Sequence, residues 1–286
     1  HRGASEAVPE HTLAAYLKAI EDGADALECD VRLTRDGHLV CVHDRRVDRT
    51  SNGRGVVSTL ELAELADLDW GSWHGRPPRP RGFARLAQAW EQGSLHLSEP
   101  VTDDDEAADV VDAADPASRH ILTLARLLEV VADAGRPVQL AVETKHPTRY
   151  AGLVERRLVE LLDRFGWGHP RLGQQTPVRV MSFSPLSLRR LRVLAPSLPS
   201  VLLMERVPLR YRDGTLPPGV RIAGPGIDVI RAHPRYVERV HRRGGAVHVW
   251  TVDRDEDVQR CLELGVDAII TNRPAHVLEA VRSHAG

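Results

Sequence analysis

The sequence predicts an α/β protein, a (β/α)8 TIM barrel that carries a hairpin and a small insertion after the second strand of the barrel. From about residue 122 onward, short apolar runs typical of strands alternate with amphipathic helical segments, and this alternation indicates parallel βαβ units. Polar residues gather at the predicted ends of these strands, which is where the active sites of TIM barrels lie. An open doubly wound sheet is the alternative, but no glycine-rich dinucleotide-binding fingerprint follows the first predicted strand.

Seven parallel strands are predicted when the second arm of the hairpin is left out. A closed barrel of this class needs eight, so we expect the first barrel strand to be missing from the sequence given and to precede His1. On this interpretation, residues 1–286 form a single barrel domain with an insertion at about 44–120. The seven strands are predicted at 26–31, 138–143, 178–183, 201–204, 226–230, 246–252 and 268–271.

The hairpin is predicted because apolar and polar residues alternate before Asp36-Gly37 and an apolar run follows, a strong short-range hairpin signal. Side chains alternate between the two faces of a strand, so Glu28 and Asp30 point the same way. If Asp36 and Gly37 are the two turn residues, the register places Asp30 opposite His43. Two carboxylates and an imidazole are therefore expected on one patch.

Helices are predicted wherever apolar residues recur at helical spacing, beginning with 13–20, which ends at Gly23. Between about 75 and 120 this pattern weakens, and the acidic run 99–115 is typical of a solvated segment. The other predicted helices are 60–65, 122–134, 153–165, 186–194, 234–243, 255–264 and 275–281.

The composition is that of an ordinary soluble globular protein, with 286 residues, 42% hydrophobic residues and a formal net charge of -2. This charge balance gives no general attraction to nucleic acid or to an anionic membrane, so no nucleic-acid partner is predicted. No apolar run is long enough to cross a bilayer, so no stable membrane insertion is predicted, and the three cysteines do not indicate a disulfide framework. A cytoplasmic location is expected, although the chain begins at His1 without an initiator Met; the oligomeric state is not predicted.

Three acids occupy predicted strand positions that meet at one barrel mouth: Glu28, Asp30 and Glu143. Oxygen ligands of this kind suit a hard divalent cation, Mg²⁺ or Ca²⁺, better than zinc, whose sites favour Cys and His. His1 and His43 bracket these acids and suit general acid–base chemistry near neutral pH.

Arg2 and Lys145 offer fixed positive charge for a phosphate, and Trp250 lies near the end of a predicted strand. A metal site, two cations and a histidine pair suit the chemistry of phosphate esters. Each feature is common by itself, and it is their joint occurrence at strand ends that predicts a site. The remaining histidines that we interpret as incidental are His11, His38, His74, His146 and His248.

Taken together, these segments resemble the glycerophosphodiester phosphodiesterase family of the phospholipase-C-like barrel superfamily. The resemblance runs from His1 to the last helix, in the order of the family. The residues that carry it are His1-Arg2-Gly3, Pro9-Glu10-His11-Thr12, Glu28-Cys29-Asp30-Val31, Asp36-Gly37, His43-Asp44, Arg49-Thr50-Ser51-Asn52-Gly53, Glu143-Thr144-Lys145, Ser182-Phe183, Trp250-Thr251-Val252-Asp253 and Thr271-Asn272-Arg273-Pro274.

The resemblance implies a barrel enzyme that hydrolyses glycerophosphodiesters to an alcohol and glycerol 3-phosphate with one divalent cation. It matches His1 and His43 to the acid/base pair, Glu28, Asp30 and Glu143 to the metal ligands, Arg2 and Lys145 to phosphate contacts, and Trp250 to the wall of the substrate cleft.

Two other functions remain open on the sequence. A lysophospholipase D or a sphingomyelinase-D-like enzyme would share the histidine pair and the carboxylates but would need an apolar groove for acyl chains. A barrel that only binds phosphodiesters would be indicated by the loss of a histidine or a carboxylate, and none is lost. For catalysis, we expect His43 to be the acid because the predicted register places it beside Asp30, with His1 as the base; the reverse assignment stays open.

Overall fold

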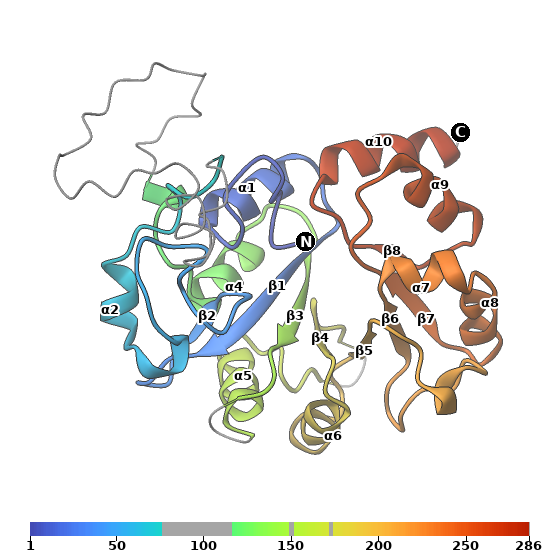
Figure 1. The fold of residues 1–286 in the computed structure, drawn as a ribbon. Coiled ribbons are helices and arrows are strands. Elements are labelled where there is room, and N and C mark those ends of the chain that lie inside the picture. The colour runs from blue at the N-terminus through green and yellow to red at the C-terminus, as the bar shows by residue number, and fades with distance from the viewer. Residues whose placement is uncertain (76–115, 149–151, 172–173, 286) are drawn as a thin grey trace, which may run out of the picture.

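The computed structural model describes residues 1–75, 116–148, 152–171 and 174–285 (Figure 1). The acidic run 99–115 and most of the predicted insertion lie outside the described residues.

Within the described residues, eight strands form one curled sheet in which seven strands are parallel and β2 alone is antiparallel (Figure 1). Their order is β2-β1-β3-β4-β5-β6-β7-β8; β1 and β2 are joined as a hairpin, β5 and β6 by a segment with one 3₁₀ turn, and the other successive strands by α-helices. This arrangement confirms the predicted α/β class and its similarity to a TIM barrel. The strands are β1 (Ala26–Leu33), β2 (Leu39–Cys41), β3 (Gln139–Thr144), β4 (Val178–Ser182), β5 (Ser200–Met204), β6 (Ile222–Pro225), β7 (Ala246–Val249) and β8 (Ala268–Ile269).

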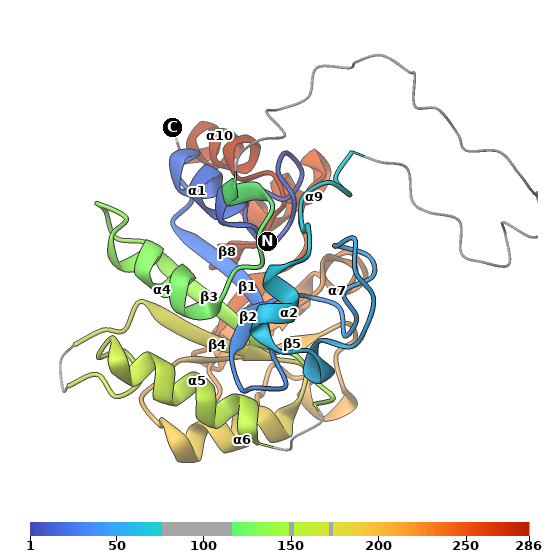
Figure 2. The same ribbon diagram turned by 90° about the vertical axis from the view of Figure 1, so that its left-hand side faces the viewer.

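The helices pack on the outer face of the sheet, as Figure 2 shows for α4, α5 and α6 beside β2, β3 and β4. No helix among the described residues has both the length and the apolar character that a membrane span requires. The helices are α1 (Leu13–Glu21), α2 (Leu62–Ala66), α4 (Leu124–Ala132), α5 (Leu153–Arg164), α6 (Pro185–Leu194), α7 (Ile227–Ala232), α8 (Arg235–Arg242), α9 (Asp255–Glu263) and α10 (Pro274–Ala285), with 3₁₀ turns η1 (Val57–Thr59), η2 (Pro116–Ser118) and η3 (Leu209–Tyr211).

One predicted strand is wrong, because 226–230 begins helix α7 and the strand, β6, lies just before it. Ile227, Val229 and Ile230 are all buried, and β-branched residues in a short buried run favour a strand in the absence of other information. Here the chain has already completed β6, and these side chains pack from one helical turn onto the core.

The interior of the curled sheet is filled by a small apolar cluster that includes Ala141, Met181, Val201 and Leu203. These residues come from β3, β4 and β5, and Trp250, just after β7, packs against the same cluster. The barrel is therefore a packed core, and a ligand has to bind at its end.

The first residues of the chain lie between β8 and β1, which do not pair with each other in the described structure. The backbone nitrogen of His1 donates to the carbonyl oxygen of Thr271 (2.6 Å), and the amide of Arg2 donates to Glu28 Oε2 (2.9 Å). Gly3 has a φ of 84°, and a Cβ there would come within 2.6 Å of the backbone of Ala15. The glycine thus allows the chain to pass close to α1, so that His1 and Arg2 lie beside the sheet.

The hairpin register differs by one residue from the prediction. Val42 donates its amide to the carbonyl of Asp30 (3.0 Å), so Val42, and not His43, lies opposite Asp30. Thr34 pairs with His38 (2.9 Å), so the loop between them holds three residues and not two. A shift of one residue reverses the face of every side chain on the second arm, and the predicted contact between His43 and Asp30 is therefore wrong.

Candidate active site

Seven of the eight predicted site residues line a single pocket of about 290 Å³. Its other walls come from residues at or directly after the carboxyl ends of β3, β4, β5 and β8, so the pocket lies at the carboxyl ends of the parallel strands. The eighth, Asp30, is 1% exposed and contacts Arg2 and Lys145 of the pocket wall. The seven residues are His1, Arg2, Glu28, His43, Glu143, Lys145 and Trp250.

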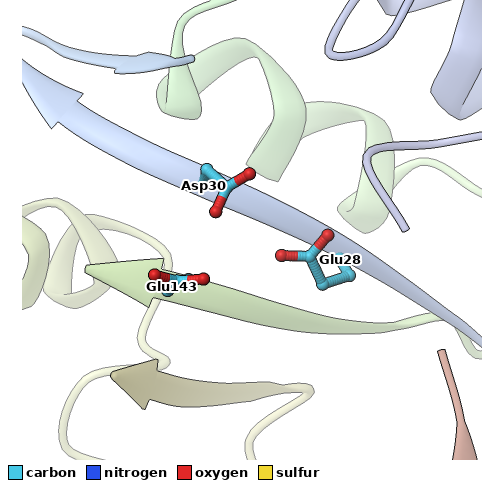
Figure 3. A group of neighbouring side chains, drawn as sticks. All are labelled: Glu28, Asp30 and Glu143. Carbon is cyan, nitrogen blue, oxygen red and sulfur yellow. The ribbon is translucent and has the colours of Figure 1, made fainter. Parts of the chain in front are cut away.

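The three predicted metal ligands meet because of strand alternation and register. Glu28 and Asp30 lie on one face of β1, and Asp30 is level with Glu143 on the neighbouring strand β3. One oxygen from each carboxylate lies within 4.8 Å of the others, and all three residues are buried (Figure 3). The donor set is entirely carboxylate oxygen, which fits a hard divalent cation such as Mg²⁺ or Ca²⁺.

The electrostatics of this trio also fit a cation. Burial, followed by the charge of Asp30, raises the pKa of Glu143 to about 8, and the same two causes raise the pKa of Glu28. Burial acts in the same direction on Asp30, but a hydrogen bond from His11 and the charges of His11, Lys145 and Arg2 hold its pKa well below the usual range. Buried carboxylates that repel one another are stabilised by a bound cation.

His43 is held by Asp44 rather than by Asp30. Its Nδ1 lies 2.7 Å from Asp44 Oδ1, and Arg49 Nε donates to the other oxygen of Asp44 (2.6 Å). The hydrogen bond from His43 is the main cause that lowers the pKa of Asp44, so this carboxylate stays ionised. Because an ionised carboxylate only accepts, Nδ1 of His43 carries the proton and Nε2 is left for a ligand in the pocket.

His1 is held by a different partner. Its Nδ1 lies 2.7 Å from Asn272 Oδ1, which also accepts from Ser5, while Asn272 Nδ2 donates to Asp253 (2.7 Å). The amide oxygen is an acceptor, so Nδ1 of His1 donates and Nε2 of the neutral ring carries a lone pair. Sequence reasoning assigned no role to Asp253 or Asn272, although both fall within motifs that carry the family resemblance.

The two predicted phosphate-binding cations are paired with carboxylates of the site. Arg2 Nε lies 3.1 Å from Asp30, and Arg2 Nη1 donates to Glu10 (3.1 Å). Lys145 Nζ lies 2.9 Å from Glu143 and 3.2 Å from Asp30. Arg2 has a φ of 57°, an uncommon conformation for a non-glycine residue, which directs its amide to Glu28 and its side chain to the acids.

The interpretation of His11 as incidental is wrong. This histidine is 5% exposed, its Nε2 lies 2.9 Å from Asp30 Oδ2, and its Nδ1 lies 2.8 Å from the hydroxyl of Tyr16. Tyr16 in turn donates to the backbone carbonyl of Glu28 (3.2 Å). His11 and Tyr16 therefore hold the β1 segment that carries Glu28 and Asp30 in place through these hydrogen bonds. Of the other histidines interpreted as incidental, His146 also lines the pocket.

Replacing His11 with Asn is expected to lower the free energy of unfolding by about 1–3 kcal/mol, because the buried polar groups of Asp30 and Tyr16 each lose one hydrogen-bond partner. Asn is chosen because His11 has a φ of 62°, which Asn tolerates better than most residues, so that the side-chain loss is measured without added backbone strain. Urea unfolding of the variant measures the effect, with His38→Asn, at an exposed position, as the control. Equal stability of the His11 and His38 variants would contradict the supporting role.

Trp250 forms an apolar wall of the pocket together with Phe183. The two rings meet edge to face with centroids 5.4 Å apart, and Trp250 Nε1 donates to the carbonyl of Gly224 (2.7 Å). The hydrogen bond and the packing fix the indole, which leaves its exposed part as a rigid surface beside the polar end of the pocket.

Comparison with known proteins agrees with this geometry. The sequence matches the family described as the glycerophosphoryl diester phosphodiesterase family over residues 1–276. It is 43% identical over 274 residues to the probable glycerophosphodiester phosphodiesterase 1 of Mycobacterium tuberculosis, covering 96% of this chain and 88% of that protein. It is 30% identical over 277 residues to a glycerophosphodiester phosphodiesterase of Bacillus subtilis, covering 96% of this chain and 82% of that one.

The fold is also similar to that of a phosphodiesterase from Oleispira antarctica, solved in complex with its product sn-glycerol 3-phosphate. The TM-score is 0.74 at 23% identity, and the alignment covers 99% of this chain and 95% of the other. The family match over nearly the full length and the identity to the bacterial relatives establish the class of protein. The chain belongs to the glycerophosphoryl diester phosphodiesterase family and is a phosphoric diester hydrolase.

Proposed function

We propose that this enzyme hydrolyses glycerophosphodiesters to an alcohol and sn-glycerol 3-phosphate, using one divalent cation held by Glu28, Asp30 and Glu143. The observation that carries the proposal is the convergence of this buried carboxylate trio with His1 and His43 at one pocket. The names of the relatives and the product bound in the Oleispira antarctica structure support the same substrate class.

The bound cation supplies charge neutralisation of the phosphodiester and polarisation of its P–O bonds. Arg2 and Lys145 line the same pocket and offer guanidinium and ammonium donors that orient the phosphate. Phe183 and Trp250 offer an apolar surface for the carbon chain of the substrate. These residues hold the phosphorus in one orientation before the bonds change.

The two histidines divide the proton transfers between them. Nε2 of His1, with its lone pair, takes the proton from the glycerol hydroxyl next to the phosphate, and that oxygen forms a bond to phosphorus. Nε2 of His43 gives its proton to the oxygen of the leaving alcohol as the P–O bond breaks, and Asp44 stabilises the charged ring before the transfer. The cyclic phosphate is then opened by water, with the two histidines in exchanged roles. The internal hydroxyl is preferred to water as the first nucleophile because it is already positioned.

The experiment that tests this function follows the products from glycerophosphocholine and from lysophosphatidylcholine by ³¹P NMR, with Mg²⁺ or Ca²⁺ present. We expect sn-glycerol 3-phosphate from glycerophosphocholine, with slower or no formation of lysophosphatidic acid. Faster turnover of the lysophospholipid would instead favour a lysophospholipase D. A substrate whose neighbouring hydroxyl is replaced by hydrogen tests the internal route, which is wrong if that substrate reacts as fast as the parent compound.

Cation binding is expected to release a proton below pH 8. The pKa of Glu143 is raised to about 8 by burial and by Asp30, so in the cation-free protein this group is protonated below that pH and must lose its proton to become a ligand. Affinity for Mg²⁺ or Ca²⁺ should therefore rise with pH up to about 8 and then level off. Because the raised pKa lies above the ordinary value of 4.5, the cation-free protein should also lose stability as the pH rises between the two values.

Calorimetric titration in buffers of different ionisation enthalpy measures the released protons. About one proton per cation is expected near pH 6.5 and close to none near pH 9. The Glu143→Gln variant is the control, since the amide carries no titrating proton. Equal affinity at both pH values without proton release would contradict the predicted protonation of Glu143.

A further inference from the structure

A second pocket, of about 520 Å³, adjoins the catalytic pocket, and Glu205 lines both. Glu205 directly follows β5, and the new pocket is lined by residues of the segment 205–212 and of helices α7 and α8. These helices lie beside β6 and β7 (Figure 1). Its floor is apolar, with Val229 and Tyr236 buried. We call it the arginine pocket, because its rim includes Arg206, Arg212 and Arg239.

The arginines of this pocket lack acidic partners. Within the described parts of the chain, Arg206 and Arg212 form no ion pair, and Arg239 donates only to the backbone carbonyl of Arg212 (3.0 Å). His233 adds a further basic group to the lining. Two acids also line the pocket, Glu205 and Asp228, and Asp228 is paired with Arg231. The other nearby acids are engaged in the pairs Asp213 with Arg243 and Glu238 with Arg242.

The pocket is held in shape by close packing. Gly214, with a φ of 88°, lies against α8 so closely that a Cβ would come within 2.3 Å of the carbonyl oxygen of Arg239. The hydroxyl of Tyr236 contacts the sulfur of Met204 (3.7 Å), which ties the floor to the end of β5. Three guanidinium groups around one hollow repel each other, and a bound anion relieves that repulsion.

We propose that the arginine pocket binds a second phosphate carried by the leaving alcohol, so that the preferred substrates are glycerophosphodiesters of a phosphorylated polyol. This inference rests on the proposed function. Guanidinium groups bind phosphate oxygens through paired, charge-assisted hydrogen bonds, which suits this occupant. Glu205, at the boundary of the two pockets, has no described partner and is an acceptor for the hydroxyl groups of a polyol that lies between the two phosphates.

The test compares glycerophosphoinositol 4-phosphate with glycerophosphoinositol, which differ only in the second phosphate. The wild-type enzyme should have the higher kcat/KM for the phosphorylated substrate. Arg212→Gln and Arg206→Gln should each lower the ratio of the two kcat/KM values about tenfold, as expected for the loss of one charge-assisted hydrogen bond. Arg189→Gln removes another exposed arginine, which lies on α6 outside both pockets and has no ion pair among the described residues, and should leave the ratio unchanged.

Calorimetric titration with inositol 1,4-bisphosphate gives a readout that does not depend on turnover. Binding should weaken about tenfold in Arg212→Gln and should not change in Arg189→Gln. An unchanged affinity and substrate ratio in the Arg206 and Arg212 variants would overturn the inference. Tight binding of inorganic phosphate that is lost in Arg212→Gln while the substrate ratio stays unchanged would also overturn it, by indicating a separate anion site. Failure of the enzyme to hydrolyse either diester would overturn the proposed function instead. The titration would then still show whether the arginine pocket binds a phosphorylated polyol.

Discussion

Replacing Glu143 with Gln is expected to reduce cation-dependent kcat by about 10³-fold or more, while the unfolding temperature of the cation-free protein stays the same or rises. The loss follows because a bound cation contributes several kcal/mol of transition-state stabilisation, and each 1.4 kcal/mol corresponds to tenfold in rate. The stability result follows because burial and the charge of Asp30 already favour the uncharged form of Glu143 in the cation-free protein, and an amide of similar shape keeps that side chain uncharged at every pH.

The matched control is Asp257→Asn, since Asp257 is also a buried carboxylate but lies on α9, away from the pocket, and is paired with Arg231. This variant should lower the unfolding temperature and keep kcat. Thermal unfolding without cation and initial rates with saturating Mg²⁺ or Ca²⁺ separate the two effects. If Glu143→Gln lost stability as Asp257→Asn does and kept its rate, Glu143 would be a structural residue.

Replacing His43 with Ala is expected to lower kcat by about 10²–10⁴-fold, which is the usual range for the loss of a general acid or base. The dependence of rate on pH should lose one of its two limbs, because one of the two titrating groups is gone. Asp44→Asn should have a smaller effect that appears in kcat, since the ring keeps a partner at Nδ1 but loses the charge of the carboxylate.

His38→Ala is the control for this prediction, because His38 lies at the turn of the same hairpin and its side chain is exposed. It should keep both the rate and the bell-shaped pH dependence. A His43→Ala enzyme with both limbs intact and a rate within a few-fold of the wild type would show that another group transfers the proton.

The sequence alone predicts those features of the fold that depend on spacing along one segment. Alternation on β1 correctly places Glu28 and Asp30 on one face, and the βαβ pattern correctly brings β3, with Glu143, next to them. These predictions hold because the periods of strands and helices are fixed by backbone geometry. The convergence of distant strand ends follows from the barrel itself, which explains why seven of the eight predicted site residues line one pocket.

Features that depend on a choice between similar local structures could not be predicted. Asp36-Gly37 is compatible with a two-residue turn and with a three-residue loop in which Gly37 takes a positive φ, and the structure has the second, with a φ of 88° at Gly37. Because of that single difference, the carboxylate partner of the His43 ring is Asp44 and not the predicted Asp30.

Polar contacts between residues far apart in the sequence could not be predicted from the sequence either. His11 supports Asp30 only because the chain takes a left-handed turn at that residue, and no local pattern signals this. The amide of Asn272 orients His1 across the gap between β8 and β1, so this pairing depends on closure of the fold. The motifs of the family resemblance contain these residues, but they do not indicate which of them are hydrogen-bonded to one another.

The most direct test of the proposed function is the release of sn-glycerol 3-phosphate from glycerophosphocholine by protein that has been treated exhaustively with chelator. We predict no release until Mg²⁺ or Ca²⁺ is restored, full recovery of the rate on restoration, and no recovery in the Glu143→Gln variant at the same cation concentration. Undiminished release by the cation-free enzyme, or recovery of the variant to the wild-type rate, would contradict a cation held by Glu28, Asp30 and Glu143 as the centre of this reaction.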